Sequence, residues 1–204
     1  GTTAVYGMGT SGLIVPTLMS TGKVDPPRSR VNREWSTVTA SKAELRAAIL
    51  AARRRLTAAP RDAEAQALSR HAADLVVRGD TVCAYVPVGS EPGSLELLET
   101  LRRGGARVLL PVAREDDAGV PQPLSWGEYV PGELVSARFG LREPKAPWLA
   151  PEVVADAATL LVPSLAVDRS GVRLGRGAGF YDRTLHLASR SARLIAVVRD
   201  EELV

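Results

Sequence analysis

Ten residues, Arg173–Asp182, combine three glycines, two arginines and a carboxylate directly after an apolar run that is typical of a buried strand. Glycines at alternate positions allow positive φ angles and close approach of the backbone, so that successive N–H groups can converge on an anion. Arginines bind phosphate oxygens in a planar, bidentate way, and a carboxylate can hold a divalent cation beside them. The stretch therefore predicts a phosphate-binding loop; the alternative is a glycine-rich turn with solvated arginines.

The alternation of apolar runs and helical patterns predicts an α/β fold. Thr81–Val86 and Arg107–Pro111 are short apolar runs, and the helical pattern from Ser94 to Arg103 between them completes a strand–helix–strand unit. Thr159–Val162 and Arg193–Val198 are two further predicted strands. We expect a single domain with an open, mostly parallel, Rossmann-like sheet flanked by helices.

The loop Pro87–Gly93 follows the first of these strands and contains Glu91. Ligands of open α/β sheets bind outside the carboxyl ends of the strands, so we expect Glu91 to bind a polar group. The alternative is an ordinary loop glutamate.

Ser41–Glu44 has the pattern of a capping box, and apolar residues then recur at helical spacing, which predicts a first helix over Lys42–Leu56. Lys42 and Arg46 stand one turn apart on that helix and can direct two cations at one target, although such residues more often form a solvated face. A second helix is expected over Ala63–Val77 and a later one over Phe180–Ser189.

Ala113–Trp148 is predicted to be a loop-rich insertion with a small antiparallel element, because turn signals replace a clear periodicity. Its extended pieces are expected around Pro123–Trp126 and Phe139–Leu141, and a short helix is expected over Pro151–Ala157. The aromatic residues of the insertion can stack on a planar ligand, with core packing as the alternative for each of them. They are Trp126, Tyr129, Phe139 and Trp148.

Composition narrows the classes of partner. The 204 residues are 45% hydrophobic, enough for one domain with a sizeable core, and the net charge of +3 predicts small anionic ligands rather than a nucleic acid. A lone cysteine, Cys83, excludes an intramolecular disulfide and is expected to be a buried thiol. No apolar stretch approaches the length of a membrane span and no secretory signal opens the chain, so we expect a cytoplasmic protein without a membrane partner.

Residues 1–40 differ from the rest in being rich in Gly, Thr, Ser and Pro without sustained periodicity. We expect an N-terminal extension or cloning leader that is poorly ordered, in which Leu13–Val15 can still add an edge strand.

Four segments relate the chain to a known family: Lys42–Arg46, Tyr85–Pro87 with Glu91, Phe139–Pro144 and, most specifically, Leu161–Asp182. With these segments, residues 41–204 resemble the 5-formyltetrahydrofolate cyclo-ligase family, also called 5,10-methenyltetrahydrofolate synthetases. The resemblance implies an ATP-dependent ring closure. The formyl oxygen of 5-formyltetrahydrofolate attacks the γ-phosphate, a second nitrogen attacks the activated carbon, and ADP, phosphate and 5,10-methenyltetrahydrofolate are released.

The resemblance also implies the roles of individual residues. Arg176, Lys42 and Arg173 would be catalytic, and Asp182 would bind Mg²⁺. Val86, Glu91, Phe139 and Tyr181 would bind the folate, which carries one or several glutamates. The ATP would be bound by Lys42, Arg46, Arg173, Gly175, Arg176, Gly177, Ala178, Gly179, Phe180 and Tyr181. A monomer or weak homodimer is expected.

Three departures from the family accompany this resemblance. Phe180 stands where family members commonly have a tyrosine. Phe139 occupies a position that we associate with a larger or different aromatic residue in the family. The family also extends through a further segment with an aspartate associated with the metal, so the chain is expected to be truncated at Val204. The competing interpretations are a non-catalytic nucleotide- or folate-binding module and a sugar-phosphate isomerase or CoA-transferase-like enzyme on a similar sheet.

Overall fold

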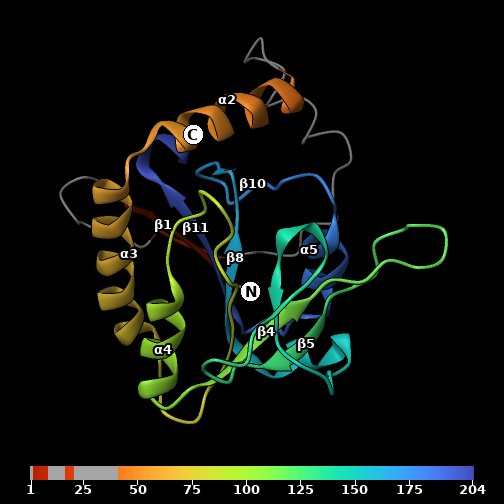
Figure 1. Ribbon diagram of the computed structural model, residues 1–204. Helices are drawn as coiled ribbons and strands as arrows, with labels where there is room; N and C mark the ends of the chain where they lie inside the picture. Colours follow the sequence, from red (N-terminus) through yellow and green to blue (C-terminus); the bar gives the residue numbers. More distant parts are fainter. Residues whose placement is uncertain (1, 9–16, 21–40) are drawn as a thin grey trace.

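A computed structural model describes residues 2–8, 17–20 and 41–204 and shows a seven-stranded sheet in the order β2-β1-β11-β8-β3-β4-β5 (Figure 1). Pairing is parallel from β1 through β11, β8 and β3 to β4, whereas β2 and β5 add antiparallel edges. The mostly parallel open sheet confirms the predicted fold class. The strands are β1 (Thr2–Met8), β2 (Thr17–Ser20), β3 (Thr81–Cys83), β4 (Arg107–Val112), β5 (Ser125–Glu128), β8 (Ala157–Pro163) and β11 (Arg193–Arg199).

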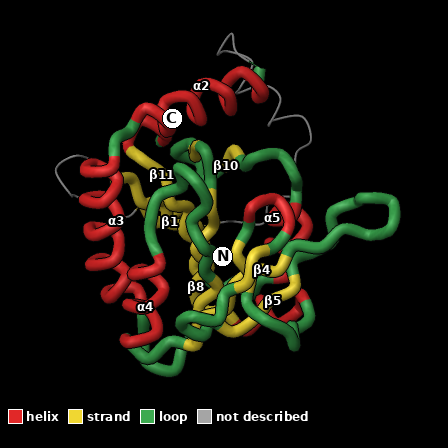
Figure 2. The backbone as a smooth tube through the Cα atoms, viewed as in Figure 1, coloured by secondary structure: helices red, strands yellow, loops and turns green. Residues whose placement is uncertain are grey.

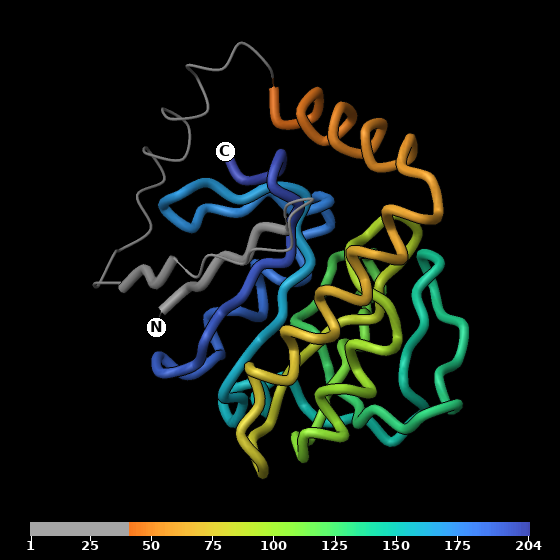
Figure 3. Tube along the Cα trace, turned by 90° about the vertical axis from the view of Figure 1, so that its left-hand side faces the viewer, coloured from red at the N-terminus to blue at the C-terminus, as the bar shows by residue number. Residues whose placement is uncertain are grey.

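Helices cover both faces of this sheet, because its central strands are apolar on both sides. α3 (Ala58–Ala72) and α4 (Leu95–Arg103) lie side by side on one face, as the turned view in Figure 3 shows. Val108 and Leu110 of β4 face these helices, whereas Leu109 between them faces the opposite core layer with Trp126. The second layer also contains side chains of α5 (Phe180–Thr184).

α2 (Lys42–Arg55) lies above the sheet, near the C-terminal residues of the chain (Figures 1 and 3). Its predicted capping box is present, with the Ser41 hydroxyl accepting from the Glu44 N–H and the Glu44 carboxylate accepting from the Ser41 N–H. Leu45, Ile49 and Leu50 of α2 pack against a small cluster beside β9 (Ala166–Val167) and β10 (Arg173–Leu174). This packing brings the first helix onto the segment that leads into the glycine-rich loop.

Three predicted elements have different bounds in the structure. The second helix begins at Ala58, earlier than predicted, because Pro60 is tolerated in the first turn, where N–H groups have no intrahelical partner. It ends at Ala72, and a 3₁₀ turn, Ala73–Leu75, follows. The first strand ends at Cys83 instead of Val86. The helix after the glycine-rich loop is α-helical only over Phe180–Thr184 and ends in a 3₁₀ turn, Leu185–Leu187.

The chain between β4 and β8 is mostly loop, as predicted (Figure 2). Its antiparallel element is the pair β6 (Val135–Ser136) and β7 (Arg142–Glu143). The extended piece expected at Phe139–Leu141 was wrong, because Arg138–Gly140 forms a 3₁₀ turn between these two strands. Pro151–Asp156 is also a 3₁₀ helix.

β1 and β2 belong to residues 1–40, where we expected a poorly ordered extension, and that expectation stays a prediction. The edge strand proposed at Leu13–Val15 lies outside the described residues. Within the described ranges, no helix is both long and apolar enough to cross a membrane.

Candidate functional site

A cavity of about 440 Å³ lies where α2, the loop after β3, the insertion and the glycine-rich loop meet. It lies outside the carboxyl ends of β3 and β8, which is where open α/β sheets bind ligands. Every site residue predicted from the sequence lines this cavity. These residues are Lys42, Arg46, Val86, Glu91, Phe139, Arg173, Gly175, Arg176, Gly177, Ala178, Gly179, Phe180, Tyr181 and Asp182.

The glycine-rich loop forms one wall of the cavity. Gly177 and Gly179 have φ angles of 106° and 84°, which residues with a Cβ atom rarely adopt. The loop is attached to α2 by a hydrogen bond of 2.9 Å from Arg46 Nε to the Gly175 carbonyl. The backbone of this wall can therefore turn N–H groups toward an anion, with a cation from the first helix beside it.

The cationic side chains that were predicted to bind ATP lie beside this loop, and they differ in their partners. Arg173 pairs with Asp182 and lies with its guanidinium 5.7 Å from the ring centre of Tyr181. Arg176 pairs with Glu91 at 2.9 Å, while Arg46 binds the loop carbonyl. Lys42 takes part in no ion pair within the described residues. This arrangement concentrates positive charge where a polyphosphate would lie against the loop.

Asp182 is the predicted metal ligand, and its side chain is 74% exposed. Across residues 41–204, no three His, Cys, Asp or Glu side chains gather as a group that could hold a metal by themselves. Mg²⁺ is commonly bound by one or two carboxylates together with substrate phosphates and water. Asp182 therefore fits a magnesium ion that arrives with a nucleotide, and it does not fit a site built entirely from protein ligands.

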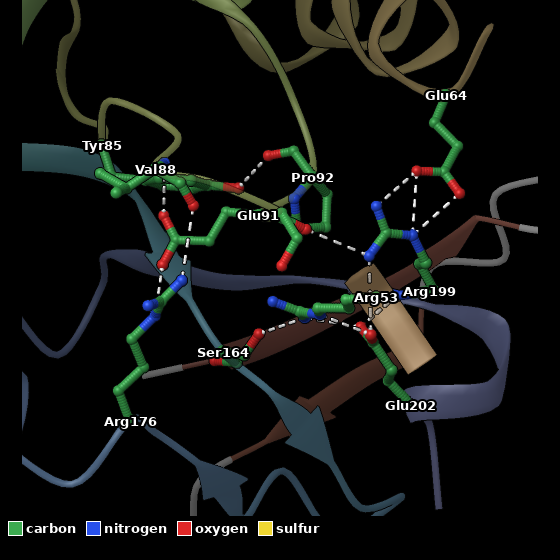
Figure 4. A network of polar contacts seen from close by, with 11 residues as sticks. Arg53, Glu64, Tyr85, Val88, Glu91, Pro92, Ser164, Arg176, Arg199 and Glu202 are labelled. Atoms are coloured by element: carbon green, nitrogen blue, oxygen red, sulfur yellow. Dashed lines mark hydrogen bonds and ion pairs between the residues drawn. The ribbon is translucent and has the colours of Figure 1, made fainter. Parts of the chain in front are cut away.

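Glu91 is held in place by contacts with Val88 and Arg176 (Figure 4). Its side chain is only 11% exposed, accepts a hydrogen bond of 2.9 Å from the Val88 N–H and pairs with Arg176 Nε at 2.9 Å. A carboxylate with one N–H and one guanidinium partner retains acceptor capacity for a ligand. The structure thus joins Glu91 to the glycine-rich loop through Arg176.

Tyr181 lines the cavity and carries a buried polar group. Its hydroxyl is buried and has no hydrogen-bond partner within the described residues. Burial raises the pKa of Tyr181 well above its ordinary value, and the nearby Glu91 carboxylate raises it further. The hydroxyl therefore stays protonated, and its hydrogen-bond donor is unused within the described residues.

Of the four aromatic residues in the insertion, only Phe139 lines the cavity. It is 58% exposed, has a φ of 61°, and its ring centre lies 6.3 Å from that of Phe180. Trp126 and Tyr129 are buried in the core, and Trp148 stacks under Arg114 at 4.1 Å. Phe139 and Phe180 thus offer aromatic surface to a planar ligand.

Sequence reasoning missed several lining residues, among them Tyr85, Val88, Ser164 and Arg142. Tyr85 and Val88 lie between β3 and Glu91, and Ser164 directly follows β8, so the carboxyl ends of the strands were the available signal. Arg142 had no such signal, because its place depends on the fold of the insertion.

Comparison with known proteins identifies the family. The sequence model of the 5-formyltetrahydrofolate cyclo-ligase family matches residues 38–204. The chain belongs to this family. A 5-formyltetrahydrofolate cyclo-ligase from Mycolicibacterium smegmatis is 63% identical over 164 residues, which are 80% of this chain and 84% of the relative. The Escherichia coli K12 protein of the same name is 39% identical over 111 residues, 54% of this chain and 59% of that protein.

Solved structures of the cyclo-ligase family share the fold. The Aquifex aeolicus 5,10-methenyltetrahydrofolate synthetase has a TM-score of 0.59 at 25% identity, covering 79% of each chain. The Mycoplasma pneumoniae synthetase has a TM-score of 0.62 at 18% identity, covering 81% of this chain and 89% of that one. Membership of an enzyme family disfavours both a non-catalytic binding module and an isomerase or transferase on the same type of sheet.

Proposed function

We propose that this cavity binds ATP and 5-formyltetrahydrofolate together and converts the folate to 5,10-methenyltetrahydrofolate, with release of ADP and phosphate. The observation that carries the proposal is the arrangement of one cavity. Its lining combines cations and a glycine-rich loop, which we assign to the ATP, with Glu91, Tyr181 and Phe139, which we assign to the folate. Such a reaction requires both substrates side by side in a fixed alignment.

The cationic side matches the first step of the reaction. The formyl oxygen attacks the γ-phosphorus and ADP leaves, so negative charge must be neutralised and the reacting atoms aligned. Lys42 and Arg46 on α2 and Arg173 beside the loop are suited to holding the phosphates. Arg176 is 48% exposed and already contacts Glu91, so its guanidinium can bridge the phosphate and folate sides.

The folate side matches the second step, in which N10 attacks the activated formyl carbon, the carbon–oxygen bond to phosphate breaks and the N10 proton leaves with the phosphate. We propose that Glu91 and the Tyr181 hydroxyl hydrogen-bond polar groups of the folate, and that Phe139 packs against one of its rings. Val86 contributes apolar surface. These contacts would orient N10 toward the carbon without a separate acid–base pair.

Mg²⁺ is proposed to bind at Asp182 with the nucleotide phosphates, where it would supply charge neutralisation. Arg173, which pairs with Asp182 here, would then be available to a phosphate oxygen. A polyglutamate tail on the folate, a monomeric or weakly dimeric state and a cytoplasmic location stay predictions.

The test is an assay of the purified chain with Mg²⁺, ATP and 5-formyltetrahydrofolate, followed by the absorbance of the methenyl product and by ADP release. We expect both signals together, each requiring the other substrate. Folate and nucleotide binding without either signal would refute the proposal in favour of a binding module.

A further inference from the structure

The loop that carries Glu91, residues 84–94, has no regular secondary structure, yet four side chains bind its carbonyl groups. Since a loop of this kind has no ladder of backbone hydrogen bonds, such side-chain contacts determine its position. The contacts are Arg176 to Val88, Arg61 of α3 to Gly89, Arg199 Nη1 to Ser90 at 3.3 Å, and the Tyr85 hydroxyl to Pro92 at 2.8 Å.

Arg199 is the most constrained of these donors, because it also binds two carboxylates (Figure 4). It is the last residue of β11 and its side chain is only 7% exposed. Its guanidinium forms a bidentate pair with Glu64 of α3, with three N–O distances of 2.8–2.9 Å, and lies 3.7 Å from Glu202. The planar fork therefore fixes the Ser90 carbonyl relative to a helix and a strand at once.

Glu202 extends this network to α2. Its carboxylate accepts from Arg53 Nε at 2.6 Å and Nη2 at 2.7 Å, and also from the Arg199 N–H at 2.8 Å. Arg53 Nη2 in turn donates to the Ser164 carbonyl at 2.8 Å, at the cavity edge of β8. The helix with Lys42 and Arg46 is thus connected through buried charges to the loop with Glu91.

Stability alone does not account for this network. Two arginines and two glutamates balance in charge, but the desolvation of buried ions offsets most of their attraction, so that buried pairs contribute little net stability. Arg53 Nη1 is even left buried without a partner within the described residues. What the network does provide is one fixed geometry for segments that lie far apart in the sequence.

We propose that Arg199 is a positioning residue. It holds the Ser90 carbonyl, and through this loop the Glu91 carboxylate, in the position that binding of the folate substrate requires. The adjoining Arg53–Glu202 pair fixes α2 in the same frame. Arg199 itself does not line the cavity, so it acts on the substrate only through the loop. The part of this assignment that concerns the KM for the folate rests on the proposed function.

The decisive variant is Arg199→Lys. Lysine keeps the positive charge but lacks the planar fork, so it cannot bind Glu64 and Ser90 simultaneously. We expect the KM for 5-formyltetrahydrofolate to rise about three- to tenfold, as for the loss of one hydrogen bond, with kcat and the KM for ATP within about twofold. Hydrogen–deuterium exchange of a peptide covering residues 84–94 should become faster.

Arg193→Lys is the matched control. Arg193 lies at the other end of β11, is also partly buried, and donates to the Thr159 hydroxyl and the Leu75 carbonyl. We expect a comparable loss of thermal stability with unchanged KM values and unchanged exchange in residues 84–94. Equal effects of the two variants, or an unchanged folate KM and loop exchange in Arg199→Lys, would overturn the assignment.

If Arg199→Lys does not fold, Glu64→Gln decides the question, because it weakens the same bidentate pair at a partly exposed position. We expect the same pattern at smaller amplitude, and a variant with native loop exchange and folate KM would again refute the positioning role. A wild-type chain without cyclo-ligase activity would refute the proposed function instead. The exchange comparison would still test the positioning of the loop.

Discussion

Arg176→Ala separates a role in catalysis from a role in stability. The side chain is 48% exposed, and its pair with Glu91 at 2.9 Å lies at the cavity mouth. A half-exposed pair contributes at most about 1 kcal/mol to the free energy of unfolding, which is about 2–4 °C in Tm for a domain of this size. Loss of a donor to the transition state, in contrast, lowers kcat by about 10²–10³, or about 2.7–4 kcal/mol.

The measurement is kcat and KM for methenyl formation at saturating Mg-ATP, together with the thermal unfolding midpoint. Arg102→Ala is a suitable control, because Arg102 is 47% exposed and pairs with Glu99 at 3.4 Å on α4, outside the cavity lining. We expect similar small changes in Tm for both variants and a large loss of kcat for Arg176→Ala alone. A kcat/KM within twofold of wild type would refute the role of Arg176 in the reaction.

Three further outcomes follow from the structure. Lys42→Ala should raise the KM for ATP with little change in Tm, because Lys42 is exposed at the start of α2; a large fall in Tm would indicate a structural role instead. Gly177→Ala should cost about 1–3 kcal/mol of stability, because its φ is 106°, and should also weaken ATP binding. Gly119→Ala, at a φ of 77° in a remote turn, should lose stability without affecting ATP, and denaturant titrations with ATP kinetics compare the two. Burial raises the pKa of Cys83 from 9.0 to about 12, so the native state retains a proton that the unfolded chain loses above pH 9. The free energy of unfolding should therefore fall with rising pH above 9, by up to about 1.4 kcal/mol per pH unit from this group. Cys83→Ala should show a shallower fall between pH 9 and 10 in denaturant titrations.

Much of the site was predictable because its signals are local. The capping box of Ser41 and Glu44 and the apolar spacing after it predict α2 from neighbouring residues alone. Alternate glycines after an apolar run likewise predict the loop Gly175–Gly179. Because the predicted strands are parallel, the loop with Glu91 is expected at the same edge of the sheet, outside the carboxyl ends of the strands. These local patterns determine backbone conformation and topology, and the predicted site residues consequently line one cavity.

Other features depend on contacts between distant segments. The sequence contains no indication that Arg53 would meet Glu202, or that Arg199 would meet Glu64 and Ser90, since these pairs are separated by more than 100 residues. The antiparallel edge β5, the 3₁₀ turn at Phe139 and the burial of the Tyr181 hydroxyl away from any partner in the described part of the chain are likewise results of packing. The sequence by itself determined the α/β class, the glycine-rich loop and the cations beside it, because propensity and periodicity act over a few residues. Only the tertiary structure decided which charges are buried together and how the Glu91 loop is held, because these depend on the docking of α2, α3 and β11 against one another.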